Sequence, residues 1–134
     1  MPDVVTCVIR HEGRILLLKR SDRVGTHRGK WACVSGYVEE GDIISGRAAR
    51  EVEEETGLSS SDVKMEKEGS PVKFFDDAEG KTWTVHPFLF RSNTDAIKID
   101  WEHTEYRWIK PPDIGHYDTV PKLKEVVESL IPLR

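Results

Sequence analysis

The sequence has few cysteines, no long apolar run and no excess of positive charge. The two cysteines among 134 residues, Cys7 and Cys33, match no zinc-binding spacing, so we expect two reduced, partly buried thiols. No apolar run approaches the roughly 20 residues that span a bilayer, and no basic-apolar leader opens the chain. The net charge is −4, and no basic patch that would bind long nucleic acid stands out. We therefore expect a cytoplasmic protein that binds neither membranes nor long nucleic acid.

Charge is what the sequence has in quantity. Charged residues make up 33% of the chain and hydrophobic residues 37%, which is typical of a globule with a highly charged surface. The length fits one hydrophobic core, so we expect a single domain over residues 1–134. The sequence leaves both a monomer and a homodimer open.

Short extended runs make up most of the chain. Pro87 lies within one of them and favours an edge strand or a bulge there. Two helices are expected, one at 43–56 and one from Pro121 to about Leu130, with Thr119 as a cap for the second. Strands, one helix, more strands and a last helix predict an α/β layered domain with a mixed sheet. The strand-like runs are 4–10, 15–18, 31–34, 63–67, 72–75, 83–90, 97–101 and 105–109.

The helix at 43–56 has the clearest signals. Asp42 precedes it as an N-cap, and Gly57 follows it where a left-handed C-cap is favoured. Ala48, Ala49 and Val52 form a narrow apolar stripe, which we expect to pack on the sheet.

The same helix carries an unusual cluster of carboxylates. At about 100° per residue, Glu51, Glu54 and Glu55 share one face, whereas Glu53 points roughly the other way. Like charges at this spacing destabilise a helix, and their position near its negative end adds to the cost. A solvated acidic face is the ordinary explanation of such a run. Because the cluster adjoins the apolar stripe, we instead predict that it binds Mg²⁺ or Mn²⁺, which carboxylate oxygens suit.

The segment that contains this cluster resembles the Nudix box. That family has Gly, five residues, Glu, seven residues, and then Arg-Glu-aliphatic-x-Glu-Glu-x-Gly-aliphatic. Residues 36–58 match every fixed position but one, since Asp42 stands where the family has Glu. Its side chain is one methylene shorter, which could weaken the bracing of the loop or the affinity for metal. Val34-Ser35 also replaces the Pro-Gly that members often carry before the box, so the loop is free to differ in shape.

The resemblance implies an α/β/α sandwich and a metal-dependent hydrolase that cleaves the diphosphate bond in derivatives of nucleoside diphosphates. It implies that Glu51, Glu54 and Glu55 bind Mg²⁺ or Mn²⁺, with the backbone carbonyl of Gly36 within reach of a metal. It also implies that Arg50 braces the glutamates through charge-assisted hydrogen bonds. Arg50, Glu54 and Glu55 are therefore expected to be catalytic.

A fourth carboxylate is expected to join them. The run Glu-His-x-x-Tyr-Arg-Trp at 102–108 also resembles the family, and Glu102 stands six residues before Trp108. Some Nudix enzymes place a carboxylate at this spacing that reaches the metals or the attacking water. We expect Glu102 to be a ligand or the general base, with Glu105 as its rival and two surface charges as the third interpretation.

Three further residues are weaker candidates for substrate contact. Lys19 and Arg20 end a strand-like run and could meet phosphates, although a pair of surface cations explains them equally well. Tyr37 lies in the loop beside the expected metals. Among the aromatic residues that could stack on a base, core packing is the stronger expectation for Trp108, and also for Trp31. The candidates for stacking are Trp83, Phe88, Trp101 and Trp108.

The leading hypothesis is a Nudix-type pyrophosphohydrolase that acts on small nucleotides. The run at 102–108 resembles members that act on nucleoside triphosphates and dinucleoside polyphosphates, which favours these substrates. ADP-sugars, oxidised nucleotides and capped RNA ends stay open. The alternative is a catalytically weak Nudix-type nucleotide-binding module, but loss of the helix glutamates would mark it and all are present. A purely structural acidic domain is a third possibility, which metal titration would separate.

Overall fold

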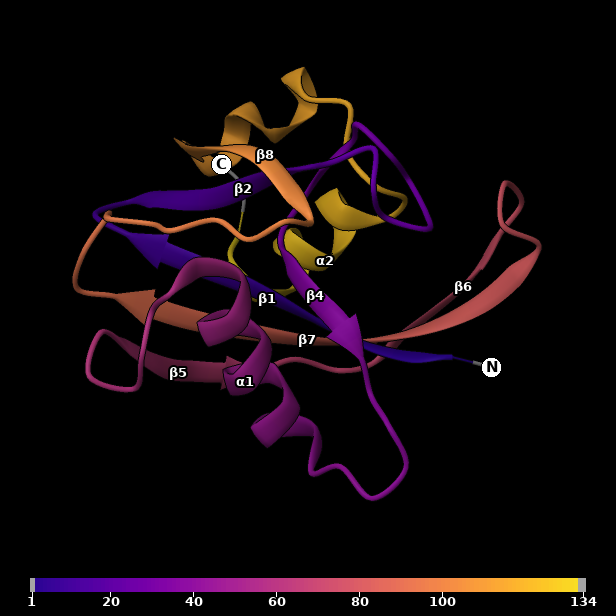
Figure 1. Cartoon of the computed structure of the whole chain (residues 1–134), viewed down its shortest axis with the longest axis horizontal. Helices are drawn as coiled ribbons and strands as arrows, with labels where there is room; N and C mark the ends of the chain where they lie inside the picture. Colours follow the sequence, from indigo (N-terminus) through magenta and orange to yellow (C-terminus); the bar gives the residue numbers. More distant parts are fainter. Residues whose placement is uncertain (1, 133–134) are drawn as a thin grey trace.

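The computed structural model describes residues 2–132, which form strands, two α-helices and a 3-10 helix (Figure 1). The strands are β1 (Asp3–His11), β2 (Arg14–Arg20), β3 (Trp31–Ala32), β4 (Val34–Tyr37), β5 (Val63–Glu68), β6 (Val72–Asp76), β7 (Lys81–Ser92) and β8 (His103–Ile109). The helices are α1 (Ile44–Thr56), η1 (Pro111–His116) and α2 (Leu123–Leu130).

All these strands belong to one mixed sheet of eight strands. β1 lies at its centre, parallel to β7 and antiparallel to β2 and β4. Each of the two central strands divides its outer edge between two partners: β1 pairs with β4 and then β2, and β7 pairs with β6 and then β5. Pro87 lies where the partner of β7 changes, between the pairs Val72↔Val85 and Glu68↔Phe88. This interruption is where a residue without a backbone N–H is tolerated in a central strand.

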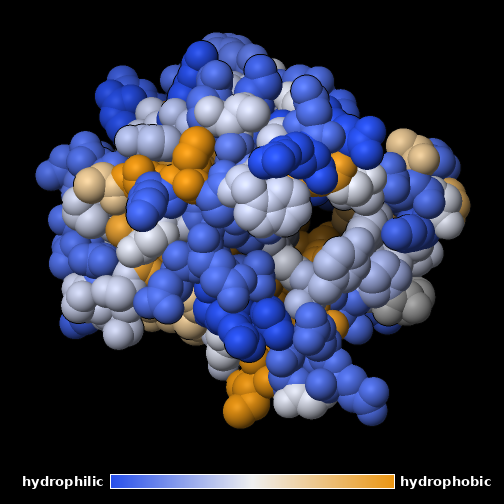
Figure 2. Space-filling view, in the orientation of Figure 1, coloured by the Kyte–Doolittle hydropathy of each residue, from blue (hydrophilic) through white to orange (hydrophobic). Residues whose placement is uncertain are grey.

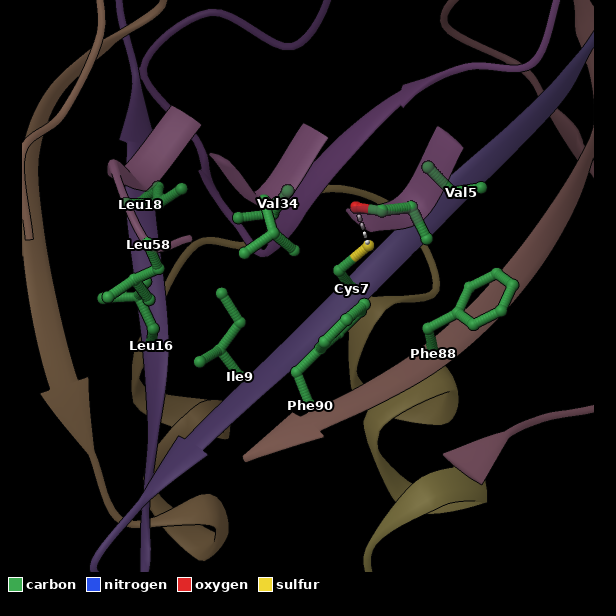
Figure 3. Close-up of a cluster of buried hydrophobic side chains, with 11 residues drawn as sticks. Val5, Cys7, Ile9, Leu16, Leu18, Val34, Leu58, Phe88 and Phe90 are labelled. Carbon is green, nitrogen blue, oxygen red and sulfur yellow. Dashed lines mark hydrogen bonds between the residues drawn. The ribbon is translucent and has the colours of Figure 1, made fainter. Parts of the chain in front are cut away.

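The centre of the sheet is buried on both faces, which explains the unbroken apolar run of β2. Leu16 and Leu18 point to the core beneath α1, together with Cys7 of β1 (Figure 3). Ile15 and Leu17 point to a second core beneath α2. Because side chains alternate along a strand, one helix covers each face. The predicted α/β class, with a mixed sheet between helices, is confirmed.

Both cysteines are free thiols inside this structure, as expected. Cys7 Sγ donates to the backbone carbonyl of Ala48 over 3.6 Å. Burial raises the pKa of the Cys7 thiol, and raises the pKa of Cys33 to about 12, so both stay protonated near neutral pH.

The termini of α1 follow the sequence signals only in part. Gly57 is the left-handed C-cap, with φ 75°. The predicted N-cap is wrong: Ile43 holds that position without a side-chain hydrogen bond, because the Asp42 carboxylate bonds to Arg47 and to the backbone of Glu39 instead. Ala49 is exposed, so the predicted apolar stripe is also wrong at that residue.

Three other expectations fail after β7. Residues 97–101 form no strand, because Ile97 and Ile99 pack against the core without a ladder partner. Two helices were expected, and η1 adds a third at Pro111–His116. α2 begins at Leu123 after Lys122, so Thr119 does not cap it.

The ends of the predicted domain, residues 1, 133 and 134, lie outside the described residues, and a single domain over 1–134 stays a prediction. Within 2–132, neither helix is long and apolar enough to cross a bilayer. The cytoplasmic location likewise stays a prediction.

Two glycines of α1 give a matched test of its ends. Gly46→Ala should raise the free energy of unfolding by roughly 0.5–1 kcal/mol, because the site is helical, exposed and open. Gly57→Ala should lower it by about 1–2 kcal/mol, since φ 75° disfavours a Cβ. Urea denaturation of both variants measures the difference, and equal effects would contradict this account of the C-cap.

Candidate active site

The buried side of α1 carries two carboxylates besides its apolar residues. Ala48 and Val52 pack against the sheet, and Glu51 and Glu55 are buried on the same side of the helix. Gly36 of β4 lies so close that a Cβ added to it would overlap the Glu51 carboxylate. Only glycine therefore allows the backbone of β4 to approach this carboxylate.

Glu55 is almost fully enclosed. Its Oε1 accepts the backbone N–H of Ser35 over 3.4 Å, whereas Oε2 has no hydrogen-bond partner, the one such buried side-chain atom among the described residues. Burial raises the pKa of the Glu55 carboxyl well above its usual value, and the neighbouring carboxylates of Glu51 and Glu102 raise it further. A buried carboxyl with a free oxygen is costly unless a ligand uses that oxygen.

A buried histidine links Glu55 to the loop before β8. Nδ1 of His103 lies 2.7 Å from Oδ1 of Asp100, and Nε2 lies 3.7 Å from Oε1 of Glu55. The His103 side chain is buried, and burial lowers its pKa against the opposing effect of Asp100. This arrangement orients one face of the Glu55 carboxylate.

Arg47, and not Arg50, braces the other carboxylate. Its guanidinium donates to both oxygens of Asp42, over 2.8 and 3.3 Å, and to Glu51 over 3.2 Å. The hydrogen bond from Arg47 holds the pKa of the Asp42 carboxyl below its usual value. The side chain of Arg47 is 10% exposed, whereas that of Arg50 is 63% exposed and pairs only with Glu54, at 3.6 Å. The expected bracing by Arg50 is therefore absent from the described contacts, and the short Asp42 side chain reaches its partner.

The remaining carboxylates lie at the open side of this cluster. Glu54 is exposed, and Glu53 points into solvent as expected. Glu102 is half-buried, and burial raises its pKa, with further contributions from nearby Asp100, Glu51 and Glu54. Glu105, its rival, is exposed and pairs with Arg107. Glu102 thus lies beside the helix carboxylates and Glu105 does not.

These groups suit a divalent cation of the Mg²⁺ type. In the part of the chain that the structure describes, no group of three or more His, Cys, Asp or Glu side chains is placed to hold a metal ion. The donors that meet are the free Oε2 of Glu55, Glu51 and the closely packed backbone of Gly36. Hard oxygen donors of this kind, with outer carboxylates and water to complete the shell, are those that Mg²⁺ and Mn²⁺ prefer.

A pocket adjoins the carboxylates, visible as a hollow in the surface right of centre in Figure 2. Its empty space, open mouth included, is about 790 Å³. Tyr37, Phe74 and Trp83 supply aromatic walls, and the rings of Tyr37 and Trp83 lie 5.9 Å apart. Gly36 and Glu102 line the end of the pocket that faces the carboxylate cluster.

The structure separates the two basic candidates. Arg20 lines the pocket and donates to the backbone carbonyl of Thr26 over 3.0 Å. Lys19, whose side chain alternates to the other face of β2, lies 6.0 Å from the ring of Trp31 and outside the pocket. Tyr37 lines the pocket, and its contact with substrate stays a prediction.

The aromatic candidates divide between core and surface. Trp31 and Trp108 pack against the cores, which confirms the stronger expectation for them, and Phe88 is fully buried. Trp101 is exposed and does not line the pocket.

Sequence reasoning missed Arg47, Asp100 and His103 as contributors to the site. The i,i+4 spacing of Arg47 and Glu51 could have indicated an ion pair, but the bend that brings Asp42 to the same guanidinium has no local signal. His103 stands in the run at 102–108, in which Glu102, and not His103, was predicted to contribute to the site.

Comparison with known proteins identifies the class. The model of the NUDIX domain matches residues 1–130. The nucleoside triphosphatase NudI of Escherichia coli O17:K52:H18 (strain UMN026 / ExPEC) is 33% identical over 125 residues, 86% of either chain. A MutT protein structure from Methanosarcina mazei Go1 superposes with a TM-score of 0.75 at 30% identity, covering 95% of this chain and 90% of that one. An Ap4A hydrolase binary complex from C. elegans shares the fold, with a TM-score of 0.81 at 18% identity and coverage of 97% and 95%.

The fold and the glutamate-bearing helix are thus those of a MutT-like nucleotide hydrolase. The chain belongs to the Nudix family and is a pyrophosphohydrolase. The family, fold and enzyme class expected from the sequence are confirmed. Nudix hydrolases generally use divalent metal ions, whereas the metal and the substrate of this chain stay predictions.

The contributions of Arg47 and Arg50 to catalysis can be compared by substituting each in turn. Arg47→Ala should lower kcat by about tenfold to a hundredfold, as for other groups that orient metal-binding side chains, because Glu51 loses its partner. Arg50→Ala should cause the smaller loss, since Arg50 contacts only exposed Glu54. Steady-state kinetics on a nucleotide substrate compares them, and a larger loss at Arg50 would contradict the geometry.

The buried carboxyl predicts a pH effect in metal-free protein. A carboxyl whose folded pKa is raised stabilises the fold while protonated, and this contribution is lost as pH rises through the folded value. In chelator, Glu55→Gln should therefore be more stable than wild type at pH 8, by roughly 1–3 kcal/mol, with the gap shrinking toward pH 4. Denaturant melts at both pH values test this, and a constant gap would count against it.

Proposed function

We propose that this enzyme hydrolyses nucleoside triphosphates to a nucleoside monophosphate and pyrophosphate. The observation that supports it most is the continuity of two features: buried carboxylates on α1 and an aromatic-walled pocket that share Gly36 as a border. The similarity to a nucleoside triphosphatase over 86% of the chain supports the same substrate class.

Glu51, Glu55 and the backbone carbonyl of Gly36 would hold Mg²⁺ or Mn²⁺, with Glu54 and Glu102 on the open side. Such an ion supplies positive charge to the phosphates and increases the acidity of water. Arg47 fixes Glu51, and His103 and Ser35 fix Glu55, so the carboxylates need little rearrangement before the reaction. Arg50 neutralises Glu54 at the rim.

The substrate would span the border between cluster and pocket. The base lies between Tyr37 and Phe74 in the pocket, because aromatic faces suit bases. Arg20, at the pocket wall, meets the phosphates as a charged hydrogen-bond donor. Lys19 lies too far from this path to contribute.

Glu102 is the group that would take the proton from the attacking water. Water attacks phosphorus, the bond from that phosphorus to the bridging oxygen breaks, and pyrophosphate leaves. The Glu102 carboxyl borders both pocket and cluster, and burial raises its pKa, which makes it a better proton acceptor.

The test is a screen of nucleoside triphosphates with Mg²⁺ and Mn²⁺, with the products identified by mass. We expect monophosphate and pyrophosphate, and no turnover in excess chelator. Release of orthophosphate alone, or full turnover in chelator, would refute the proposed function.

The matched variants Glu102→Gln and Glu105→Gln test the proton acceptor. Glu102→Gln should lower kcat by about a hundredfold or more, the usual contribution of a general base. Glu105→Gln should keep wild-type kcat, because Glu105 is exposed and pairs with Arg107 on β8. Equal kcat values for the two variants would remove Glu102 from the mechanism.

A further inference from the structure

A buried carboxylate, Asp76, lies at the far side of the pocket from the catalytic cluster and takes no part in the proposed reaction. It ends β6 and is 4% exposed. Oδ1 accepts the backbone N–H groups of Ala78 and Glu79, which closes the turn between β6 and β7. Oδ2 accepts from two side chains, His27 over 2.8 Å and Trp83 over 3.3 Å. Its two oxygens thus have separate partners.

His27 reaches Asp76 from a distant part of the chain, across 49 residues of sequence. It lies in the loop of residues 21–30, where its φ of 49° is in the left-handed region. Such a backbone is unfavourable for a residue other than glycine and persists where surrounding contacts hold it. Among the described hydrogen bonds of residues 22–29, the others stay within residues 20–30. The His27–Asp76 pair is therefore the polar contact that ties this loop to the hairpin.

The tie closes a ring around the pocket. Thr26 and His27 of the loop line the pocket, as do Phe74 and Trp83 of the β6–β7 hairpin. Trp83, held through its Nε1 by the same Asp76 oxygen, packs against Tyr37 at 5.9 Å. In Figure 2 the hollow is bordered on all sides in this view. One carboxylate oxygen therefore joins the loop and the hairpin that both supply lining residues of the pocket.

We propose that His27 and Asp76 are positioning residues that fix the width of the base pocket and so determine which nucleotide bases the enzyme accepts. The proposal rests on the proposed function for the identity of the ligand. It assigns the pair to base recognition and not to chemistry, because neither residue adjoins the carboxylates of α1. A loop released from the hairpin would leave the base without one wall, while the phosphates and the catalytic carboxylates keep their contacts.

Two variants separate this role from that of holding the fold. His27→Ala removes the tie and leaves the Asp76 contacts to Trp83 and to the turn. Asp76→Asn keeps an oxygen for the turn but places an amide where His27 and Trp83 donate. The matched control is His86→Ala: His86 pairs with Asp3 at 3.0 Å and its side chain is 16% exposed, against 2.8 Å and 13% for His27, yet it lies outside the pocket.

The measurements are steady-state kinetics on the four common nucleoside triphosphates and calorimetric binding of a nucleoside monophosphate and of pyrophosphate. His27→Ala should raise KM by about tenfold, the effect of one charged hydrogen bond, with kcat within about twofold. The ratios of kcat/KM among the four bases should move toward one. Monophosphate should bind about tenfold more weakly while pyrophosphate binding is unchanged. His86→Ala should leave all of these values at the wild-type level.

Each result decides the matter. Unchanged KM and base preference in His27→Ala, or equal weakening of monophosphate and pyrophosphate, would overturn the proposal. If His27→Ala does not fold, Asp76→Asn decides by the same measurements, and the failure of both would assign the pair to the fold instead. A wild-type enzyme that turns over no nucleoside triphosphate would refute the proposed function, while monophosphate binding would still test the pair.

Discussion

The packing of α1 against β1 and β4 sets the direction of every carboxylate on the helix. Ala48 and Val52 are the apolar contacts, and Gly36 lets the strand come close beside them. Once the helix is seated there, Glu51 and Glu55 are buried beside the sheet. The energy of apolar burial therefore holds charged groups where water would otherwise compete for them.

Such a site needs partners that compensate for the burial, and the structure supplies them unevenly. Arg47 donates hydrogen bonds to both Glu51 and Asp42. Glu55, in contrast, keeps one carboxylate oxygen without a hydrogen-bond partner. Glu51 is therefore held in place by a hydrogen bond, whereas Glu55 has an oxygen that can bind a ligand. Asp100 and His103 add a second layer, in which a loop far along the chain restricts the rotation of Glu55.

Local patterns in the sequence predicted what local rules control. The period of the helix separated Glu51 and Glu55 from Glu53, and Gly57 marked the C-terminus, because both depend on residues within a few positions. The prediction was wrong at Ala49, since the buried face is centred on Ala48, with Val52 and Glu55 on either side, and Ala49 lies about 100° around the helix. Hydrophobic patterning assumes that carboxylates are exposed, so it could not predict that Glu51 and Glu55 are buried and Ala49 is exposed. The bond between Arg47 and Asp42 depends on the path of the loop before α1, and the contact between His27 and Asp76 joins residues 49 apart, so neither has a short-range signal in the sequence.

β1 and β7 each pair with two different strands along one edge, and this pairing affects how such an enzyme can change during evolution. The carboxylates proposed to be catalytic stand on a helix over the most deeply buried strands, whereas much of the pocket wall belongs to short or peripheral pieces: β3, β4, β6 and the loop of residues 21–30. Substitutions in β6 and in the loop of residues 21–30, most of whose residues are exposed or half-buried, disturb few core contacts, and β6 meets the centre of the sheet along only part of β7. Selection can therefore remodel the wall that reads the ligand while the hydrolytic apparatus is inherited intact, so that one scaffold can serve many metabolites.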